Sequence, residues 1–340
     1  MKKALRMMIV ALILLLVGAF GIGVQLFGIH TFIGSRKRDL TARTFERNPA
    51  RLERGKYIAT SMGCLYCHSP HDWSKREEPI LPGMEGAGQQ LRYTDLPGRV
   101  IAPNLTPDKE TGAGTWSDDA LARAIREGIG HDGRALFPIM PYAHYRNMPD
   151  EDLASVVVYL RSLPAVRNPL PQTQIIFPVK YFMRNGPEPI TASVPEPDLS
   201  DPVKRGAFLV NLIGCADCHT PIDKQHNPIA GMEFAGGQII SLPSGKVASS
   251  NLTPDPSGIP YYDDAMFVKA MRTGTVGARE LNDAMPWMVF GKMTDQDLTA
   301  IFAYLKTVKP VRHNVDNSLP PTLCPLDNTM HGGGNMNRKQ

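Results

Sequence analysis

Two short runs of cysteine and histidine carry the most specific chemistry in this chain of 340 residues. Each run has the form C-x-x-C-H, and they occupy residues 64–68 and 215–219. Two thiols one helical turn apart can add to the two vinyl groups of one porphyrin, and the adjacent histidine then lies beneath the iron. The spacing predicts two covalently bound haem c groups, held through Cys64, Cys67, Cys215 and Cys218, with His68 and His219 as axial iron ligands.

Two other kinds of site share parts of this pattern. A zinc site needs four converging ligands, but the two runs lie in separate repeats, and each already has its own histidine. A thioredoxin-like redox pair does not require histidine directly after its second cysteine. The fifth cysteine, Cys324, has no second cysteine or following histidine nearby, so we expect a free thiol without a role.

The amino-terminal residues predict a membrane anchor. Residues 7–29 form an uncharged, mostly apolar run that follows Lys2, Lys3 and Arg6. A helix of this length spans about 35 Å, which is enough for a bilayer core of about 30 Å. Such a long run without a good small-residue cleavage site favours an uncleaved anchor over a cleaved signal. Haem c is attached on the outer side of energy-coupling membranes, so we expect everything after Arg36 to lie on the periplasmic side of a bacterial cytoplasmic membrane.

Composition and charge exclude other classes. The mean hydropathy of -0.20 is too low for a polytopic membrane protein. The net charge of +4 comes from the first 38 residues, which hold six basic and no acidic side chains. The remainder has 31 basic against 33 acidic residues, a net of -2, so it lacks the basic footprint of a nucleic-acid binder.

The chain also contains an internal duplication. Several motifs recur in the same order, and their offset falls from 151 to 145 residues because loops tolerate small deletions. The recurring motifs are Arg54-Gly55 with Arg205-Gly206, GMEGAG at 83–88 with GMEFAG at 231–236, NLTPD at 104–108 and 251–255, and Met140-Pro141 with Met285-Pro286. We therefore expect an anchor over 1–36, domains over 37–165 and 200–315, a proline-rich linker over 166–199 laid over a domain surface, and a tail over 316–340.

Each copy is expected to be mostly helical. A first helix should run into the C-x-x-C-H motif, and a middle helix should begin after the cap Ser117 and end at Gly128. The last helix shows the i, i+3, i+4, i+7 spacing of one buried face in both copies. Its apolar positions are Leu153, Val156, Val157, Leu160 and Leu163, repeated as Leu298, Ile301, Phe302, Leu305 and Val308.

These motifs together resemble the class I c-type cytochromes. More narrowly, the chain is similar to the haem domains of the cytochrome subunits of membrane-bound alcohol and aldehyde dehydrogenases, over about residues 50–165 and 200–312. The resemblance implies an all-α fold of two tandem cytochrome c domains. It also implies that Gly55 and Gly206 allow close crossing of the first and last helices, beside Tyr57, Phe208, Tyr159 and Tyr304. Those subunits typically have three haem domains, whereas this chain has two.

The resemblance places the second axial ligand in the loop before the last helix. Met140 and Met285 occupy matching positions, each followed by proline and an aromatic residue, and we expect them to ligate the two irons. Met148 and Met293 also match, but they begin the last helix, where the family places no ligand. Met288 has no counterpart, and His131 and His144 face no histidine in the other copy, so we expect these two histidines on the surface.

Several other residues have two open interpretations. The NLTPD segments could line the haem or its propionates, or could form a turn held by Asn and Thr side chains. Trp73, Trp116 and Trp287 could pack on porphyrin or within the core. We assign no role to His71, His226 or His313.

The expected function is electron transfer without catalysis. A membrane-anchored dihaem cytochrome would pass single electrons from a membrane quinol or dehydrogenase to a periplasmic cytochrome or terminal oxidase, as a carrier or as a subunit of a larger complex. The alternative is a dihaem enzyme of the peroxidase or thiosulfate dehydrogenase type. That alternative needs one iron with an open or unusual ligand, and the two matching methionine loops argue against it.

Overall fold

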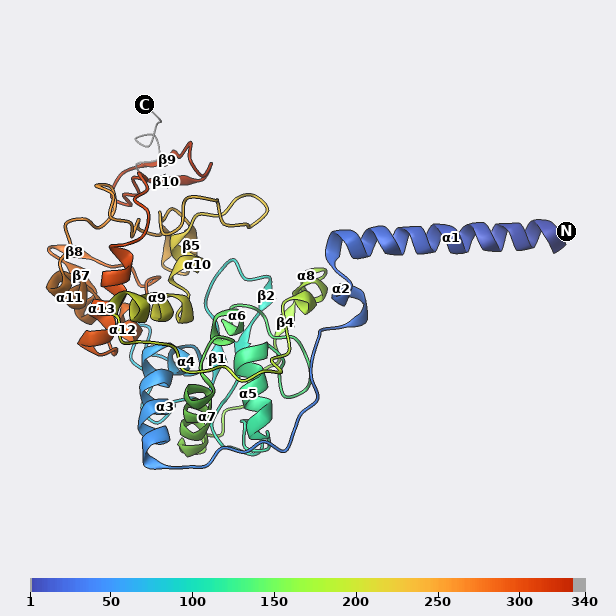
Figure 1. Cartoon of the computed structure of the whole chain (residues 1–340), viewed down its shortest axis with the longest axis horizontal. Coiled ribbons are helices and arrows are strands. Elements are labelled where there is room, and N and C mark those ends of the chain that lie inside the picture. Colours follow the sequence, from blue (N-terminus) through green and yellow to red (C-terminus); the bar gives the residue numbers. More distant parts are fainter. Residues whose placement is uncertain (1, 333–340) are drawn as a thin grey trace.

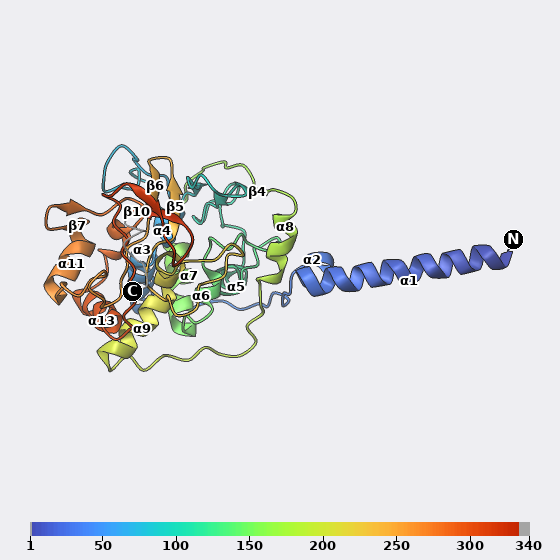
Figure 2. The same cartoon turned by 90° about the horizontal axis from the view of Figure 1, so that it is seen from above.

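One long helix, α1 (Lys2–Phe27), projects from a body in which two similar repeats lie side by side (Figure 1). The computed structural model describes residues 2–332, and residues 1 and 333–340, the end of the predicted tail, lie outside the described part. Within residues 2–332, α1 is the one helix long and apolar enough to cross a membrane. The short helix α2 (His30–Ile33) follows it and leads toward the body (Figure 2).

The first repeat consists of helices connected by long loops. Its helices are α3 (Pro49–Ser61), α4 (Cys64–Cys67), α5 (Asp118–Glu127), α6 (Tyr142–Tyr145) and α7 (Asp150–Ser162). Its short strands are β1 (Gln89–Gln90), β2 (Gly98–Arg99) and β3 (Ile101–Ala102). Strands β1 and β3 pair antiparallel, with Gln89 opposite Ala102.

The second repeat has the same order of helices. They are α9 (Pro202–Leu212), α10 (Cys215–His219), α11 (Asp264–Thr273), α12 (Trp287–Phe290) and α13 (Asp295–Leu305). Its strands are β5 (Ile239–Leu242), β6 (Gly245–Ala248), β7 (Thr275–Val276) and β8 (Arg279–Glu280). They form two antiparallel hairpins, in which Ile239 lies opposite Ala248 and Thr275 opposite Glu280.

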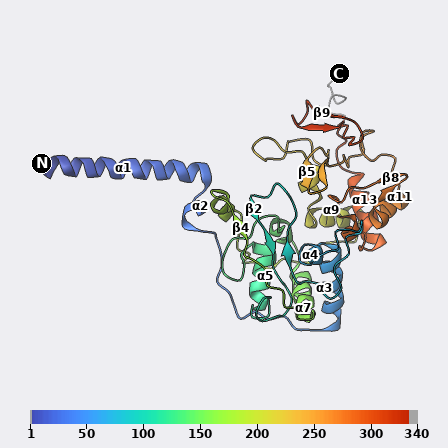
Figure 3. The same cartoon turned by 180° about the vertical axis from the view of Figure 1, so that it is seen from behind.

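The segment between the repeats is partly structured. Its elements are β4 (Gln174–Ile175), α8 (Val179–Phe182) and the 3-10 helix η1 (Met183–Asn185). β4 pairs with β2 of the first repeat, as expected for a linker laid over a domain surface, but the sequence pattern did not predict the two helical turns. After the second repeat, β9 (Pro321–Leu323) and β10 (Met330–Gly332) form a C-terminal hairpin, seen from behind in Figure 3.

Local sequence explains where the main helices begin. Asn48 and Asp201 cap α3 and α9, each followed by a proline at the first helical position. The side chain of Ser117 accepts a hydrogen bond from the backbone N–H of Ala120, and Gly128 ends α5 in the left-handed conformation. The predicted boundaries of this middle helix are therefore confirmed.

The first and last helices of each repeat cross in very close contact. A Cβ atom on Gly55 would lie 1.9 Å from the backbone oxygen of Ser155, and one on Gly206 would lie 1.9 Å from that of Ala300. The Cβ atoms of Tyr159 and Tyr304 lie at these same points. Ion pairs also join the crossing helices, between Arg54 and Asp152 and between Arg205 and Asp297, with N–O distances of 2.7 and 2.6 Å. Four of the five predicted apolar positions on each last helix are at most 4% exposed, which confirms the predicted buried faces.

One expected feature of the fold differs. The first helix does not run into the C-x-x-C-H motif, because α3 ends at Ser61 and α4 begins at Cys64. Gly63 lies between them with φ of 89°, and Gly214 has φ of 69° at the same place in the second repeat. This left-handed turn, which favours glycine, redirects the chain so that the motif forms a separate helical turn.

Replacing Gly55 by alanine should destabilise the first repeat. Alanine at this position gains about 1 kcal/mol of helix propensity, but its Cβ has no rotamer that avoids Ser155, so α3 and α7 must separate. Overpacking of this kind typically costs about 1–3 kcal/mol. Denaturant unfolding of the haem-loaded full chain measures the change, with the exposed neighbour Lys56→Ala as control. Equal stability of Gly55→Ala and the control would contradict the close-crossing account.

Candidate haem sites

The histidine of each C-x-x-C-H motif is held in one orientation by the backbone. Nδ1 of His68 lies 2.8 Å from the carbonyl oxygen of Pro103, and Nδ1 of His219 lies 2.7 Å from that of Ser250. A carbonyl only accepts, so Nδ1 carries the proton in both rings and Nε2 keeps its lone pair. Burial lowers the pKa of both histidines, which favours the neutral imidazole that binds iron.

The NLTPD segments position these two carbonyl groups. Asn104, one residue after Pro103, accepts hydrogen bonds at Oδ1 from the backbone N–H and the hydroxyl of Thr106, at 2.9 and 2.7 Å. Its Nδ2 donates to the carbonyl of Val166, after the last helix, at 2.7 Å. In the second repeat Asn251 bonds to Thr253 N and to the carbonyl of Val311, at 2.9 and 2.8 Å. The interpretation as a turn held by Asn and Thr is thus confirmed, and Asn104 also lines the cavity described next.

A cavity of about 1530 Å³ opens beside the first motif. Cys64, Cys67, His68 and Met140 all line it, together with apolar side chains of the first repeat. The cavity thus brings together two thiols, an imidazole with an available lone pair, and a thioether, which is the donor set of a His/Met haem c. These residues fit the group that the sequence predicts.

The two methionine loops have the same local structure. The backbone N–H of Met140 donates to Phe137 O, and that of Met285 donates to Asn282 O, at 3.1 and 3.0 Å. The aromatic residue two positions later packs against the glycine that ends the middle helix. A Cβ on Gly128 would lie 2.7 Å from the ring of Tyr142, and one on Gly274 would lie 2.4 Å from that of Trp287. The aromatic residue therefore fixes each loop to the end of α5 or α11.

The other candidate iron ligands have surroundings that differ from those of Met140 and Met285. Met148 and Met293 are 1% exposed and belong to the hydrophobic core, although Met148 also borders the cavity. His131 is exposed, as expected, and stacks on Trp116 with ring centroids 4.1 Å apart. His144 was expected on the surface, but it lies at the contact between the repeats, where its Nε2 is 2.8 Å from Oδ2 of Asp217.

The tryptophans have different surroundings. Trp116 lines the cavity of the first repeat. Trp287 is buried against Gly274, and Arg76 of the first repeat lies over its ring at 4.8 Å. Trp73 packs against His71, with ring centroids 4.9 Å apart. Core and interface packing therefore accounts for Trp73 and Trp287.

The two repeats contact each other in a reciprocal way. His144 of α6 reaches the second motif, where its ring also lies 3.2 Å from the Cβ position of Gly214. The equivalent residue of the second repeat, Val289 of α12, lies 3.9 Å from the Cβ position of Gly63, directly before the first motif. Pro286, Val289 and Phe290 even line the cavity of the first repeat. Each methionine loop thus lies against the C-x-x-C-H motif of the other repeat.

Comparison with known proteins agrees with this geometry. A family model described as "Cytochrome c" matches residues 52–164 and again residues 203–309. The chain belongs to the cytochrome c family. The two matched regions correspond to the two repeats, each with one C-x-x-C-H motif.

Several curated proteins are similar to this cytochrome. It is 32% identical over 229 residues to a nicotinate dehydrogenase subunit of Pseudomonas putida, covering 64% of this chain and 18% of that protein. It is 29% identical over 269 residues to the fructose dehydrogenase cytochrome subunit of Gluconobacter japonicus, covering 76% and 52%. It is 28% identical over 263 residues to a "Diheme cytochrome c-type" protein of Cereibacter sphaeroides, covering 76% and 86%.

These relatives confirm the predicted cofactor. The family and the dihaem relative together support two covalently bound haem c groups in this cytochrome. The chain spans only 18% and 52% of the nicotinate and fructose dehydrogenase relatives, so their complete activities do not carry over to it.

Sequence reasoning missed one group of residues. Cys324 was expected to have no partner, but its Sγ is buried 3.3 Å from Nε2 of His313, a residue without an expected role. Asp327 and His331 complete this group. The spacing Cys-x-x-Asp-x-x-x-His could have revealed three of the four residues, whereas His313 could be added only from the fold.

Proposed function

We propose that this cytochrome is a membrane-anchored electron carrier, or an electron-transfer subunit, with all-α class I domains over residues 37–165 and 200–315. The observation that carries the proposal is the reciprocal contact between repeats. Each methionine loop packs against the haem-attachment motif of the other repeat, through His144 and Asp217 and through Val289 and Gly63. In this proposal the two motifs that would hold the redox centres lie at one interface, which would favour direct electron exchange between them.

The proposed ligands follow from the donor atoms. Cys64 and Cys67 in the first domain, and Cys215 and Cys218 in the second, would hold the two haems through thioether bonds. His68 with Met140, and His219 with Met285, would hold the two irons. A haem iron with such a pair exchanges one electron between its ferrous and ferric states, at a potential raised by the soft thioether. The protein holds each imidazole through Nδ1, fixes each methionine loop through Tyr142 or Trp287, and surrounds the first site with apolar side chains.

The alternative function is a dihaem enzyme of the peroxidase or thiosulfate dehydrogenase type. An enzyme of this kind requires an iron with an open or exchangeable position. The loops of Met140 and Met285 have matching hydrogen bonds and matching aromatic supports, so neither site is specialised. This similarity favours the carrier.

The partners are proposed from chemistry and from the relatives. Several relatives are named as cytochrome subunits of fructose, gluconate and alcohol dehydrogenases. We therefore infer a membrane dehydrogenase or a quinol as the donor, and a periplasmic cytochrome or terminal oxidase as the acceptor.

Contacts at the end of α1 support a retained anchor over a cleaved signal. Nδ2 of Asn185 donates to the carbonyl of Phe27 at 2.9 Å and to the hydroxyl of Thr31 at 2.8 Å. Phe182 of α8 stacks on Phe27, with ring centroids 5.2 Å apart. Phe177 of the linker, just before α8, is 77% exposed, so its apolar ring can enter the membrane surface. The end of α1 thus packs against the folded protein. We place both domains on the periplasmic side because haem c is attached there.

Carbon monoxide binding distinguishes the carrier from the enzyme. Both ferrous irons are coordinatively saturated in our proposal, so the reduced full chain should bind less than about one tenth of an equivalent of carbon monoxide at neutral pH. The matched control is Met140→Ala, which opens one site and should bind about one equivalent. Stoichiometric binding by the unaltered protein, accompanied by peroxide turnover, would support the enzyme instead.

Membrane fractionation tests the anchor and the partner together. The unaltered chain should sediment with the cytoplasmic membrane, and after detergent extraction it should copurify with a dehydrogenase whose substrate reduces both haems. A variant with residues 2–27 replaced by a cleavable signal should be soluble in the periplasm. Recovery of the unaltered chain in the soluble periplasmic fraction would reject the anchor.

A further inference from the structure

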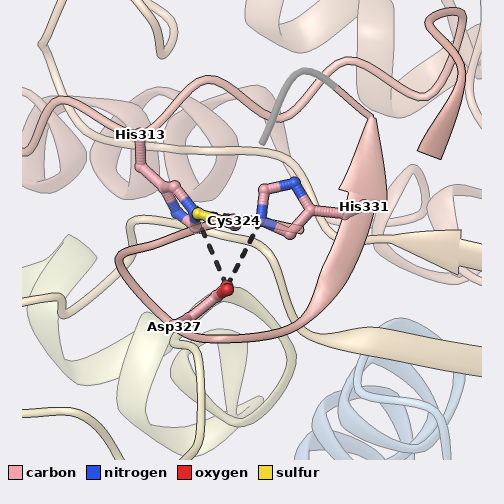
Figure 4. A group of neighbouring side chains, drawn as sticks. All are labelled: His313, Cys324, Asp327 and His331. Carbon is pink, nitrogen blue, oxygen red and sulfur yellow. Dashed lines mark hydrogen bonds and ion pairs between the residues drawn. The ribbon is translucent and has the colours of Figure 1, made fainter. Parts of the chain in front are cut away.

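Four potential metal ligands converge in the buried region between the second domain and the C-terminal hairpin. They come from the segment after α13 and from the β9–β10 hairpin (Figure 4). We call them the C-terminal cluster: His313, Cys324, Asp327 and His331. All four residues are at most 6% exposed, and one potential ligand atom from each lies within 4.8 Å of the others.

The Nε2 atoms of the two histidines face one another inside the cluster. Nδ1 of His313 lies 2.9 Å from the carbonyl oxygen of Ala235, and Nδ1 of His331 lies 3.1 Å from that of Gly332. Both Nδ1 atoms therefore donate, and both Nε2 atoms present lone pairs to each other at 3.2 Å. Two lone pairs at this distance repel unless a proton or a metal cation lies between them.

The carboxylate is arranged in the same way. Oδ1 of Asp327 accepts hydrogen bonds from the backbone N–H and the hydroxyl of Thr329, at 3.0 and 2.8 Å. Its other oxygen, Oδ2, is buried and has no hydrogen-bond partner among residues 2–332. Oδ2 lies 3.4 Å from Nε2 of His331 and 3.6 Å from Nε2 of His313, too far for charge-assisted hydrogen bonds.

Four of the six ligand-atom separations are close to those of a tetrahedral zinc site, and the whole set lies within 4.8 Å. Zinc bonds of about 2.0–2.1 Å to nitrogen and oxygen and about 2.3 Å to sulfur place tetrahedral ligands about 3.3–3.6 Å apart. The measured separations are 3.2 Å between the two Nε2 atoms, 3.3 Å from Sγ of Cys324 to Nε2 of His313, and 3.4 and 3.6 Å to Oδ2. One thiolate and one carboxylate also neutralise a divalent cation, so the buried site would carry no net charge.

Comparison of the two repeats shows that this site is specific to the second. Asn168 of the first repeat corresponds to His313, and its Nδ2 donates to Ala87 O at 2.8 Å, as Nδ1 of His313 does to Ala235 O. The amide of Asn168 is therefore sufficient for the hydrogen bond to the alanine carbonyl. His313 makes the same hydrogen bond through Nδ1 and adds a second nitrogen, Nε2, that reaches the cluster. Likewise Gln89 corresponds to Gly237, where a Cβ would lie 2.6 Å from Oδ2 of Asp327. The second repeat thus has a histidine and a glycine where the site needs them.

We propose that one Zn²⁺ ion binds in the C-terminal cluster with His₂CysAsp ligation and fastens the tail to the second domain. All four positions are filled by protein, as in structural zinc sites. The ion would hold the β9–β10 hairpin against residues 235–237. Within this segment the backbone N–H of Gly236 donates to the carbonyl of His219 at 2.7 Å, so the segment also supports the second haem-attachment motif.

Metal analysis of the haem-loaded full chain tests this proposal. After equilibration with Zn²⁺ and removal of loosely bound metal, we expect one zinc per chain beside two haem irons. X-ray absorption at the zinc edge should show one sulfur at about 2.3 Å and three nitrogen or oxygen ligands at about 2.0–2.1 Å. Thioether-bound haem cysteines do not mimic this signal, because zinc is the absorbing atom.

Variants locate the ion. Cys324→Ser should lower zinc affinity at least tenfold and remove the sulfur signal, and His331→Gln should also lower the affinity at least tenfold. His226→Asn alters an exposed histidine of the same domain outside the cluster and should keep one zinc. The circular dichroism spectrum shows whether each variant folds, and the wild-type zinc-edge spectrum decides the question if a variant does not. A wild type that takes up no zinc, prefers copper, or shows no sulfur ligand would overturn the proposal.

Discussion

The histidine of each C-x-x-C-H motif, the proposed haem ligand, is oriented by one hydrogen bond from its Nδ1 to a backbone carbonyl, and much of each domain serves to place that carbonyl. The acceptors, Pro103 and Ser250, directly precede the turns formed by Asn104 and Asn251. Those asparagines also bind the carbonyls of Val166 and Val311, beyond the last helices. The last helices cross the first at Gly55 and Gly206, and a left-handed glycine joins each first helix to its motif. The orientation of each imidazole is therefore coupled to the helix crossing.

Duplication gave the protein a second copy of this arrangement and also an interface between the two copies. Because α6 of one repeat packs at the motif of the other, and α12 does the same in return, the interface is formed from the parts that hold the haems. The contact is polar on one side, between His144 and Asp217, and apolar on the other, between Val289 and Gly63. The repeats have thus diverged in chemistry while they keep one geometry. The C-terminal cluster is a second such divergence, because it replaces Asn168 and Gln89 by His313 and Gly237.

Local and repeated patterns made most of this protein predictable from its sequence. The C-x-x-C-H spacing, the cap at Ser117 and the apolar period of α7 each depend on neighbouring residues, and the duplication allowed each inference to be checked against its copy. Contacts between distant residues could not be predicted in this way. No periodic pattern links His144 to Asp217, or His313 to Cys324, because loops of irregular length bring them together. The break at Gly63 was missed because a helical pattern does not show a left-handed residue.

The near-infrared absorption of the oxidised full chain most directly tests the central claim, that His and Met would saturate both haem irons. A thioether sulfur bound to ferric haem gives a charge-transfer band in this region, and the unaltered protein should show the intensity of two such haems. Met140→His and Met285→His should each remove half of the band and lower the potential of one haem only. Met148→Leu, in the core beside the first site, should leave the band unchanged. A band that is absent from the unaltered protein, or that survives in either histidine variant at full intensity, would contradict the account.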